Sequence, residues 1–194
     1  MTAPYTVRPV RAHEWREARA LRLAALCDDA APVAFLTTYD DAVARPDEFW
    51  REQTRASSVD AGEEAVVRQF VAVSEDGTWL GTAVALVEEV GQRDYAGSVI
   101  DSRGGAVVGV YLIPEHRGRG VMEDVLAAVT GWLRTRGLPR ARLNVHADNA
   151  RARRLYEKAG FRATGTQFAS SIGPELEMAL ELSAGASGSG DRPR

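Results

Sequence analysis

The sequence predicts an α/β or α+β domain with a mixed β-sheet. After a mainly helical N-terminal third, short apolar runs typical of strands alternate with stretches of helical periodicity, a pattern typical of this class. The chain has 194 residues, which fits one domain followed by a tail. A domain of this length buries a core large enough to be stable without disulfide bonds.

The N-terminal third predicts one strand followed by two helices. Residues 5–10 form the strand, and Pro9 places it at a sheet edge or a strand end. Residues 13–27 form the first helix. Its apolar positions near helical spacing are Trp15, Ala18, Leu21 and Ala25. Proline is favoured at the first position of a helix, so Pro46 predicts the start of the second helix, which continues over 47–56.

The middle of the chain predicts a hairpin, a loop and a further strand. Residues 66–73 and 80–89 are apolar runs separated by a turn-forming segment, so they pair as a hairpin. Residues 91–105 are rich in Gly, Ser and Asp and predict a loop. The apolar run AVVGVYLI, residues 106–113, predicts the next strand.

A helix over 120–136 is indicated by a continuous apolar face. The residues on that face are Met122, Val125, Leu126, Val129 and Leu133. Acidic residues occupy its first turn and arginines its last, as the helix dipole favours. Gly137 and Pro139 end the helix.

The C-terminal part predicts strands around one more helix. Residues 141–146 form a strand, and residues 150–159 form a helix capped by Asp148 or Asn149 and closed by Gly160. The remaining expected elements are strands over 161–165 and 176–182 and a disordered tail over 183–194.

Composition excludes several classes of function. The net charge of −3 and the absence of a basic stripe argue against nucleic-acid binding. No apolar run approaches the length of a membrane span, and the polar start of the chain shows no signal peptide. The lone cysteine, Cys27, cannot pair within the chain, which indicates the cytoplasm, and we expect it to be a small buried hydrophobe. The three histidines lack metal-ligand spacing, so no metal is expected.

The segment PEHRGRGVMEDVL, residues 114–126, joins a strand to a helix through glycines and arginines. Glycines let the backbone approach a ligand closely, and a helix N-terminus presents unpaired N–H groups and positive potential. Arg117 and Arg119 bring cationic side chains to the same place. The segment therefore predicts an anion cradle suited to a pyrophosphate; a glycine turn with solvated arginines is the alternative.

Two segments resemble the GCN5-related N-acetyltransferases. The family's acyl-CoA signature, Arg/Gln-x-x-Gly-x-Gly/Ala between a strand and a helix, is matched by Arg117-Gly118-Arg119-Gly120-Val121-Met122, with Met122 where Gly or Ala is usual. A second block over 143–165 is similar to the family's strand, Asn, helix, Leu-Tyr and Gly-Phe arrangement. Its matching residues are Asn149, Leu155-Tyr156 and Gly160-Phe161. The resemblance is strong from about 66 to 182 and weaker over 1–65.

The resemblance implies a fold and a cosubstrate. The fold would be a mostly antiparallel sheet of about seven strands with flanking helices, splayed at the acyl-CoA site, in a single N-acetyltransferase domain over 1–182. The cosubstrate would be acetyl-CoA, with pantetheine pairing to the backbone of the strand 106–112, chiefly at Val110 and Leu112. The implied cofactor-binding residues are Val110, Tyr111, Leu112, Arg117, Gly118, Arg119, Gly120, Val121, Met122 and Asn149. Met122 also lies on the apolar helix face and can turn into the core, so binding should survive.

The resemblance also implies direct acetyl transfer to an amine, without a covalent acyl-enzyme. Tyr156 is the expected general acid, although it shares a helix face with Ala152 and Leu155 as a core residue would. The general base stays open because Ala106 stands where many relatives have Glu. The candidates are Glu88, Glu89, Asp101, His146 and water.

The acceptor site should be formed by the N-terminal helices and the loops 28–41 and 91–105. A small-molecule primary amine is the expected acceptor, attracted by the acidic residues Asp28, Asp29, Asp40 and Asp41. The aromatic residues that could line its pocket are Phe35, Tyr39, Phe49 and Trp50. Alternatives are an acetyltransferase acting on a protein N-terminus or lysine, and a non-catalytic acyl-CoA-binding sensor. A homodimer is a further expectation; acyl-chain preference stays open.

Overall fold

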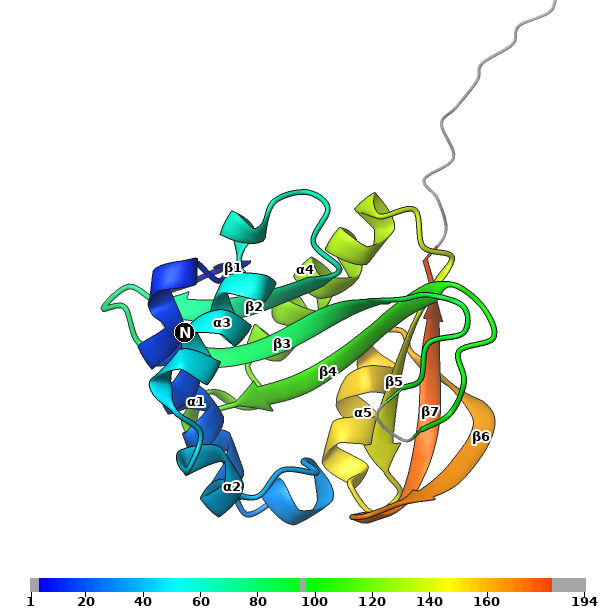
Figure 1. The fold of residues 1–194 in the computed structure, drawn as a ribbon. Coiled ribbons are helices and arrows are strands. Elements are labelled where there is room, and N and C mark those ends of the chain that lie inside the picture. The colour runs from blue at the N-terminus through cyan, green and yellow to red at the C-terminus, as the bar shows by residue number, and fades with distance from the viewer. Residues whose placement is uncertain (1–3, 95–96, 183–194) are drawn as a thin grey trace, which may run out of the picture.

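The computed structural model describes residues 4–94 and 97–182 as a seven-stranded sheet flanked by helices (Figure 1). The expected tail over 183–194 lies outside the described residues. The strands are β1 (Tyr5–Pro9), β2 (Val67–Ser74), β3 (Trp79–Glu88), β4 (Gly104–Leu112), β5 (Arg140–His146), β6 (Arg162–Ser170) and β7 (Gly173–Glu181). The α-helices are α1 (Trp15–Leu26), α2 (Tyr39–Val43), α3 (Asp47–Ser57), α4 (Val121–Thr135) and α5 (Ala150–Lys158).

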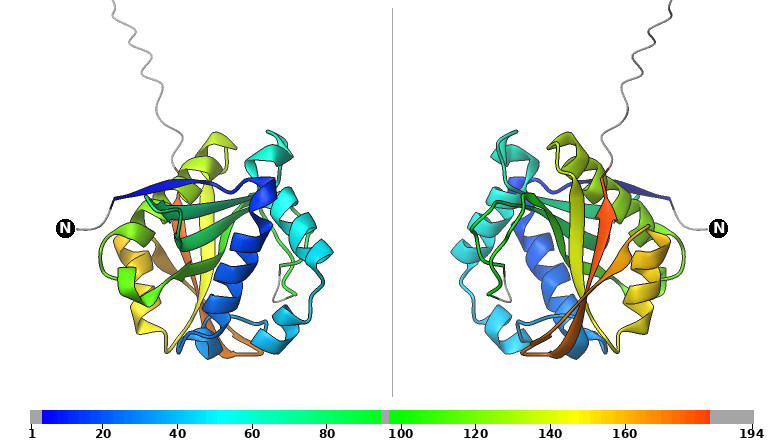
Figure 2. Two further views of the ribbon diagram at one scale, coloured as in Figure 1. Left: turned by 90° about the vertical axis from the view of Figure 1, so that its left-hand side faces the viewer. Right: turned by 90° about the vertical axis from the view of Figure 1, so that its right-hand side faces the viewer.

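The sheet has the order β1-β2-β3-β4-β5-β7-β6, and every neighbouring pair is antiparallel except β4–β5. Figure 2 shows the sheet edge-on, with α1 and α3 on one face and α4 and α5 on the other. The class predicted from sequence is therefore confirmed. No helix in the described ranges is long and apolar enough to cross a membrane.

The main core lies between the sheet and α4. All five residues of the predicted apolar face of α4 are buried. They pack against inward-facing residues of the central strands, among them Ala85, Val107 and Leu143. At Gly105 the helix comes so close that an added Cβ would lie 2.8 Å from Leu133 side-chain atoms. A strand can therefore run through the glycines at 104 and 105, which the sequence had placed in the loop 91–105.

The N-terminal helices depart from expectation in three details. Pro46 is the N-cap of α3 and not its first residue, because its backbone is extended (ψ 158°) while its carbonyl accepts from the Phe49 N–H at 3.1 Å. Helix α2 was not predicted; its five residues are too few to show a period, and the Thr38 side chain caps it. Cys27 is exposed, because it follows the last buried position of α1, Leu26.

The C-terminal strands are longer than predicted. β6 extends to Ser170 and forms a hairpin with β7. The segment between the two predicted strands is mostly exposed and polar, so its sequence gives no apolar alternation.

The sheet opens at its centre. β4 and β5 pair at two positions, Gly105 with Ala141 and Ala106 with Arg142, and then separate. A bulge in β4 shifts its register against β3 between Thr82 and Val84, and Gly109 adopts a φ of +62° there. A bulge bends the strand that carries it. The two strands therefore diverge, as the family resemblance implied.

Candidate active site

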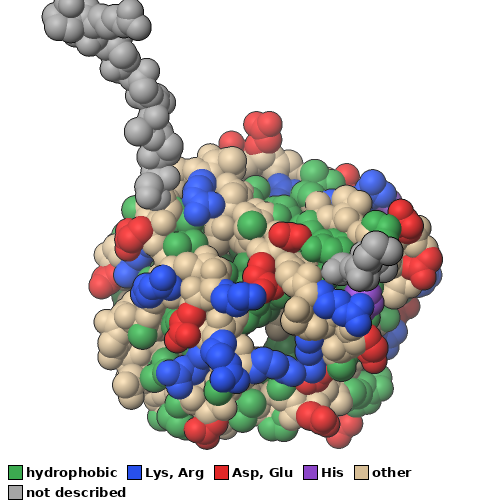
Figure 3. All heavy atoms as spheres, turned by 180° about the vertical axis from the view of Figure 1, so that it is seen from behind, with side chains coloured by type: hydrophobic (Ala, Val, Ile, Leu, Met, Phe, Trp, Pro, Cys, Tyr) green, Lys and Arg blue, Asp and Glu red, His purple; other side chains and the backbone are tan. Residues whose placement is uncertain are grey.

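A cleft of about 1180 Å³ occupies the gap between the diverging strands. Its walls come from both layers of the fold: α1 and α3 on one side of the sheet, and the N-terminal ends of α4 and α5 on the other. Figure 3 shows an open hollow on the side away from the view of Figure 1, with Lys and Arg side chains gathered around its rim. The predicted site residues can be placed relative to this cleft.

The backbone of β4 turns polar groups away from β3 toward the cleft, and one of them, the Leu112 carbonyl, accepts from Arg117 Nε. The N–H of Ile113 donates to the Leu80 carbonyl of β3 at 2.9 Å, and Tyr111 lies opposite Thr82. Because backbone groups alternate in direction along a strand, those of Val110 and Leu112 face away from β3 toward the opening. Both residues line the cleft. Tyr111 differs, because its side chain is buried against α1.

The segment predicted to be an anion cradle has an open backbone at the start of α4. Gly118 and Gly120 have φ angles of +74° and +85°, with no heavy atom within 4 Å of an added Cβ at either position. Between residues 4–94 and 97–182, no acceptor receives the N–H groups from Gly118 to Met122. The Met122 side chain is 2 % exposed and packs in the core, so it leaves the cradle open. Methionine at the position where the family usually has Gly or Ala therefore does not obstruct this loop.

Arg117 does not turn its guanidinium into the cradle, contrary to expectation. Its Nη2 donates to the Asp28 carboxylate, and its Nε donates to the Leu112 carbonyl at 3.0 Å. Burial raises the pKa of Asp28, but hydrogen bonds from the Ala30 N–H and from Arg117, together with the charge of Arg117, hold it below its usual value. Arg117 therefore fastens the loop before α4 to the end of α1.

Other arginines supply the free positive charge. Arg119 is exposed and makes no ion pair within the described part of the chain. Arg151 and Arg154 on α5 are also exposed and line the cleft. Neither was predicted to be a site residue, although both follow closely after Asn149 in the second family block. The Asn149 side chain accepts from the Ala152 N–H at 3.1 Å, which confirms the helix cap.

Tyr156 lies where α5 meets the cleft. Its side chain is 7 % exposed, lines the cleft and packs edge-on against Phe161. Burial raises the pKa of the Tyr156 hydroxyl above its ordinary value, and no described residue forms a hydrogen bond with it. Tyr156 is thus both a packed residue and a proton-bearing group at the cleft, so the two interpretations from sequence are compatible.

The candidate bases separate into two groups. Glu89 pairs with Arg103 at 2.9 Å and Asp101 hydrogen-bonds to Ser102, and neither lines the cleft. His146 lines it, but its Nδ1 accepts from the Asp148 N–H, and its Nε2 would lie 2.5 Å from a Cβ added to Gly173. Glu88 also lines the cleft.

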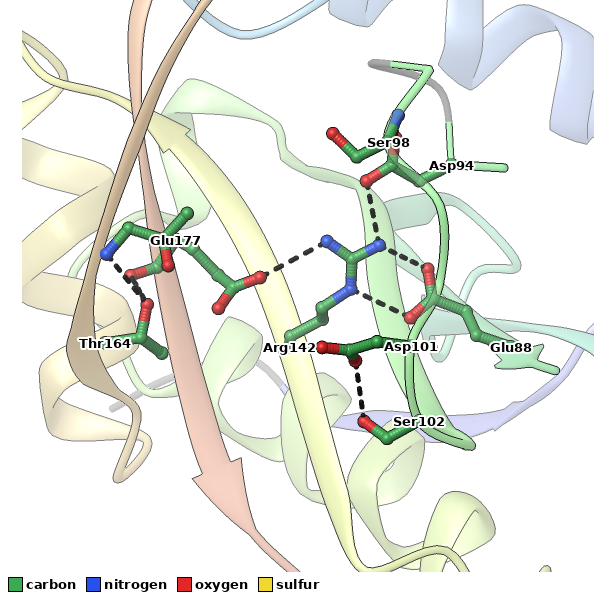
Figure 4. A network of polar contacts seen from close by, with 9 residues as sticks. Glu88, Asp94, Ser98, Asp101, Ser102, Arg142, Thr164 and Glu177 are labelled. Atoms are coloured by element: carbon green, nitrogen blue, oxygen red, sulfur yellow. Dashed lines mark hydrogen bonds and ion pairs between the residues drawn. The ribbon is translucent and has the colours of Figure 1, made fainter. Parts of the chain in front are cut away.

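Glu88 belongs to an ion-pair network centred on Arg142 (Figure 4). Arg142 donates to both carboxylate oxygens of Glu88 at 2.8 and 2.7 Å, to Asp94 at 3.0 Å and to Glu177 at 3.3 Å. The hydrogen bond and charge of Glu88 raise the pKa of Arg142, so it stays charged. The network lies beside Ala106, which is paired with Arg142 and carries no carboxylate of its own.

The predicted acceptor side of the cleft is only partly as expected. Asp28 is engaged by Arg117, and the Asp41 carboxylate accepts a hydrogen bond from the hydroxyl of Thr38, the N-cap of α2. Asp29 and Asp40 are exposed and lie off the cleft. Of the four aromatic residues, the cleft is lined by Phe35, Phe49 and Trp50 but not by Tyr39. Among the described residues no group of His, Cys, Asp and Glu is arranged to hold a metal ion.

Comparisons with known proteins agree on one family. The family model described as Acetyltransferase (GNAT) family matches residues 31–161. An uncharacterized N-acetyltransferase, YobR from Bacillus subtilis (strain 168), is 39% identical over 64 residues, which cover 33% of this chain and 26% of the relative. The chain thus aligns with about a quarter of that relative's length.

Solved structures share the fold at low sequence identity. A GNAT-family acetyltransferase from Streptococcus pneumoniae superposes with a TM-score of 0.70 and 17% identity, covering 93% of this chain and 100% of the other. Ribosomal-protein-S5-alanine acetyltransferase from Vibrio fischeri gives 0.69 and 15%, covering 92% and 93%. The putative acetyltransferase yncA from Salmonella typhimurium, solved with its cofactor acetyl-CoA, gives 0.67 and 18%, covering 94% and 96%.

Proposed function

This chain belongs to the acetyltransferase (GNAT) family, and we propose that it transfers an acetyl group from acetyl-CoA to a primary amine of a small molecule by direct attack on the thioester. One observation carries the proposal. One cleft is lined by the β4 residues Val110 and Leu112, by Gly118 and Met122 at the two ends of a run of N–H groups with no described acceptor, and by Tyr156.

The residues present fit acetyl-CoA. Five consecutive N–H groups from Gly118 to Met122 and the exposed cations Arg119, Arg151 and Arg154 would hold its phosphates. The backbone of Val110 and Leu112 would pair with the pantetheine amides in place of a neighbouring strand. Asn149, which also lines the cleft, would contact the pantetheine as well.

Acetyl-CoA, when bound, supplies a thioester whose acetyl group passes to a neutral amine as the thiolate departs. The Val110 N–H faces the opening and would polarise the acetyl carbonyl, a role of fixed donors that contributes a few kcal/mol. The Tyr156 hydroxyl holds its proton at neutral pH and would give it to the departing sulfur. The amine must first lose a proton, because alkylamines are protonated near neutrality.

Glu88 is the side chain that we propose to receive that proton, through water. It lines the cleft beside Ala106, where the family residue is absent, and Arg142 fixes its orientation. Arg142 engages both Glu88 oxygens, so a bridging water would use their remaining lone pairs. Water alone, without Glu88, is the alternative. We further propose that the enzyme is cytoplasmic, consists of one domain over 1–182 and forms a homodimer.

Calorimetric titration of the purified chain tests the cofactor site. Acetyl-CoA and desulfo-CoA should bind at micromolar concentrations, and Arg119→Ala or Gly120→Glu should weaken binding at least about tenfold, because each removes positive potential from the cradle. Arg134→Ala, an exposed arginine at the far end of the same helix, is the matched control and should bind normally. No binding at millimolar cofactor would overturn the proposal.

Turnover tests the chemistry. A panel of primary amines is incubated with acetyl-CoA, and the released thiol is measured. Binding without release of thiol for any amine, or for N-terminal and lysine peptides, would instead support the acyl-CoA-binding sensor.

A further inference from the structure

We propose that Arg22 and Trp50 form an anion-binding subsite on the helical side of the cleft, so that the acceptor carries a carboxylate as well as its amine. The inference rests on the proposed function and names the class of acceptor: small amino acids and related amino carboxylates.

Arg22 is a cation in the cleft without a carboxylate partner. It lies on the face of α1 that lines the cleft together with Ala18, Leu21 and Ala25. Its guanidinium stacks on the Phe35 ring at 4.4 Å, and in the described ranges it forms neither an ion pair nor a hydrogen bond. Burial lowers the pKa of Arg22, yet an arginine stays charged at neutral pH.

Two other arginines that line the cleft, Arg142 and Arg117, do have carboxylate partners. Arg142 is surrounded by three carboxylates, and Arg117 is bonded to Asp28. Desolvating a cation without a counter-ion is unfavourable. An anionic group of a bound ligand would supply the counter-ion that Arg22 lacks, in a fork geometry that arginine offers to carboxylates.

Trp50 provides a second donor in the same wall. Its side chain is 5 % exposed and lines the cleft, and its Nε1–H has no hydrogen-bond partner among residues 4–94 and 97–182. Phe35 connects the two donors, because it packs against the buried cluster that contains Trp50 and lies under the Arg22 guanidinium. A buried N–H without an acceptor is costly, and a carboxylate oxygen would satisfy it.

The opposite wall fixes the direction in which such an acceptor would lie. On the sheet side and the β3–β4 connection, the described lining residues include three carboxylates, Glu88, Asp94 and Glu175, against two cations, Arg93 and Arg142. An amino group is therefore favoured toward the sheet and a carboxylate toward the helices. That orientation points the amine at the opening between β4 and β5, where Tyr156 and Val110 lie.

A simpler role for Arg22 would be to cover Phe35. The chain offers a matched control, because Arg16 on the same helix stacks on the Trp15 ring at the same 4.4 Å but does not line the cleft. Arg22→Met and Arg16→Met each remove one stacked guanidinium. If stacking is the whole role, the two variants behave alike.

The first experiment compares amino acids with their own carboxamides as acceptors, using thiol release. Wild-type enzyme should prefer the acid of the best pair by at least about tenfold in kcat/KM, and Arg22→Met should bring the acid-to-amide ratio of kcat/KM close to one. Arg22→Lys keeps the charge and should restore part of the preference, whereas Arg16→Met should resemble wild type. Equal use of acid and amide by the wild type would overturn the proposal.

The second experiment needs no turnover. The indole N–H resonance of Trp50, assigned with Trp50→Phe, is followed by NMR while N-acetylglycine, a carboxylate without a free amine, is added. A saturable shift that Arg22→Met removes and Arg16→Met retains supports the subsite. No shift at millimolar N-acetylglycine overturns it. A saturable shift with no acetyl-CoA binding would leave the subsite standing while the acetyltransferase proposal fails, so the two can be told apart.

Discussion

Burial suits Tyr156 to the role of proton donor that we propose for it. Its hydroxyl sits in a buried position that disfavours the phenolate and therefore raises its pKa. The proton is thus retained throughout the neutral range and is given up when a strongly basic group, such as a departing thiolate, forms beside it. The burial that packs Tyr156 in the core would therefore also keep its hydroxyl protonated for the proposed acid role.

Tyr156→Phe separates these two contributions. We expect kcat to fall by about 10² or more, a typical loss for a general acid. Acetyl-CoA affinity should be unchanged, and the free energy of unfolding should change by less than ~0.5 kcal/mol, because the hydroxyl has no partner among the described residues. Steady-state kinetics, calorimetry and urea unfolding measure the three quantities. Tyr39→Phe, off the cleft, is the control. An undiminished kcat would remove Tyr156 from the mechanism.

Asp28 gives the protein an acid-sensitive contact at the cleft. Its pKa is lower in the folded protein than in the unfolded chain, so its contribution is complete above about pH 4 and is lost as the pH falls through the folded pKa. Asp28→Asn should lower the free energy of unfolding by about 1–3 kcal/mol at pH 7 and by less near pH 3. Urea unfolding at both pH values measures this. Asp29→Asn, an exposed neighbour, should have no effect; a pH-independent loss for Asp28→Asn would contradict the argument.

The bulge in β4 depends on the backbone conformation of Gly109 and changes the direction of the strand. Gly109 adopts a φ of +62°, which other residues reach at a cost of about 1–2 kcal/mol. Gly109→Ala should lower the free energy of unfolding by that amount and weaken acetyl-CoA binding, because the bulge turns Val110 toward the opening. Gly131→Ala, within α4 and in open space, should be neutral or stabilising. Unfolding curves and titration of both variants test this; normal binding by Gly109→Ala would show that the bulge is dispensable.

Elements with a full period and clear end signals could be predicted from the sequence. α4 and α5 begin and end within one or two residues of the expected positions, because an apolar face and closing glycines mark them. α2 could not be found, since one turn carries no periodicity. The start of β4 was hidden because glycines signal loops, whereas Gly105 is glycine to admit Leu133.

Arg142 joins parts of the chain that the opening would otherwise leave apart. It projects from β5 and holds carboxylates from β3, from the β3–β4 connection and from β7 (Figure 4). Arg142→Met would leave these acids close together without a cation, so we expect a loss of about 3–5 kcal/mol at pH 7.

Arg103→Met is the control for Arg142→Met. The Arg103–Glu89 pair is exposed on both sides, at 44% and 46%, so its removal should cost less than about 1 kcal/mol. Urea unfolding of both variants measures the difference. Equal losses would mean that the network around Arg142 is not a stabilising centre.

Some features of the site depend on residues that are consecutive in the sequence, and others on residues that are far apart in it. The proposed cradle was predicted from one segment in which glycines, arginines and a helix start are consecutive, and no described residue accepts from the N–H groups of Gly118 to Met122. The partner of Arg117 could not be predicted, because Asp28 is 89 residues away in sequence. The same holds for Arg142 and Glu88, which are 54 residues apart. Folding alone brings such pairs together.

The cleft that passes between the two layers has a kinetic consequence. Because α1 and α3 line the cleft on one side of the sheet and the N-terminal ends of α4 and α5 on the other, we expect donor and acceptor to bind on opposite sides, so that neither blocks the other's departure. Both substrates could then reside together before any bond changes. Double-reciprocal plots at several fixed acceptor concentrations should intersect, whereas the parallel lines of a ping-pong enzyme would require an acylated residue.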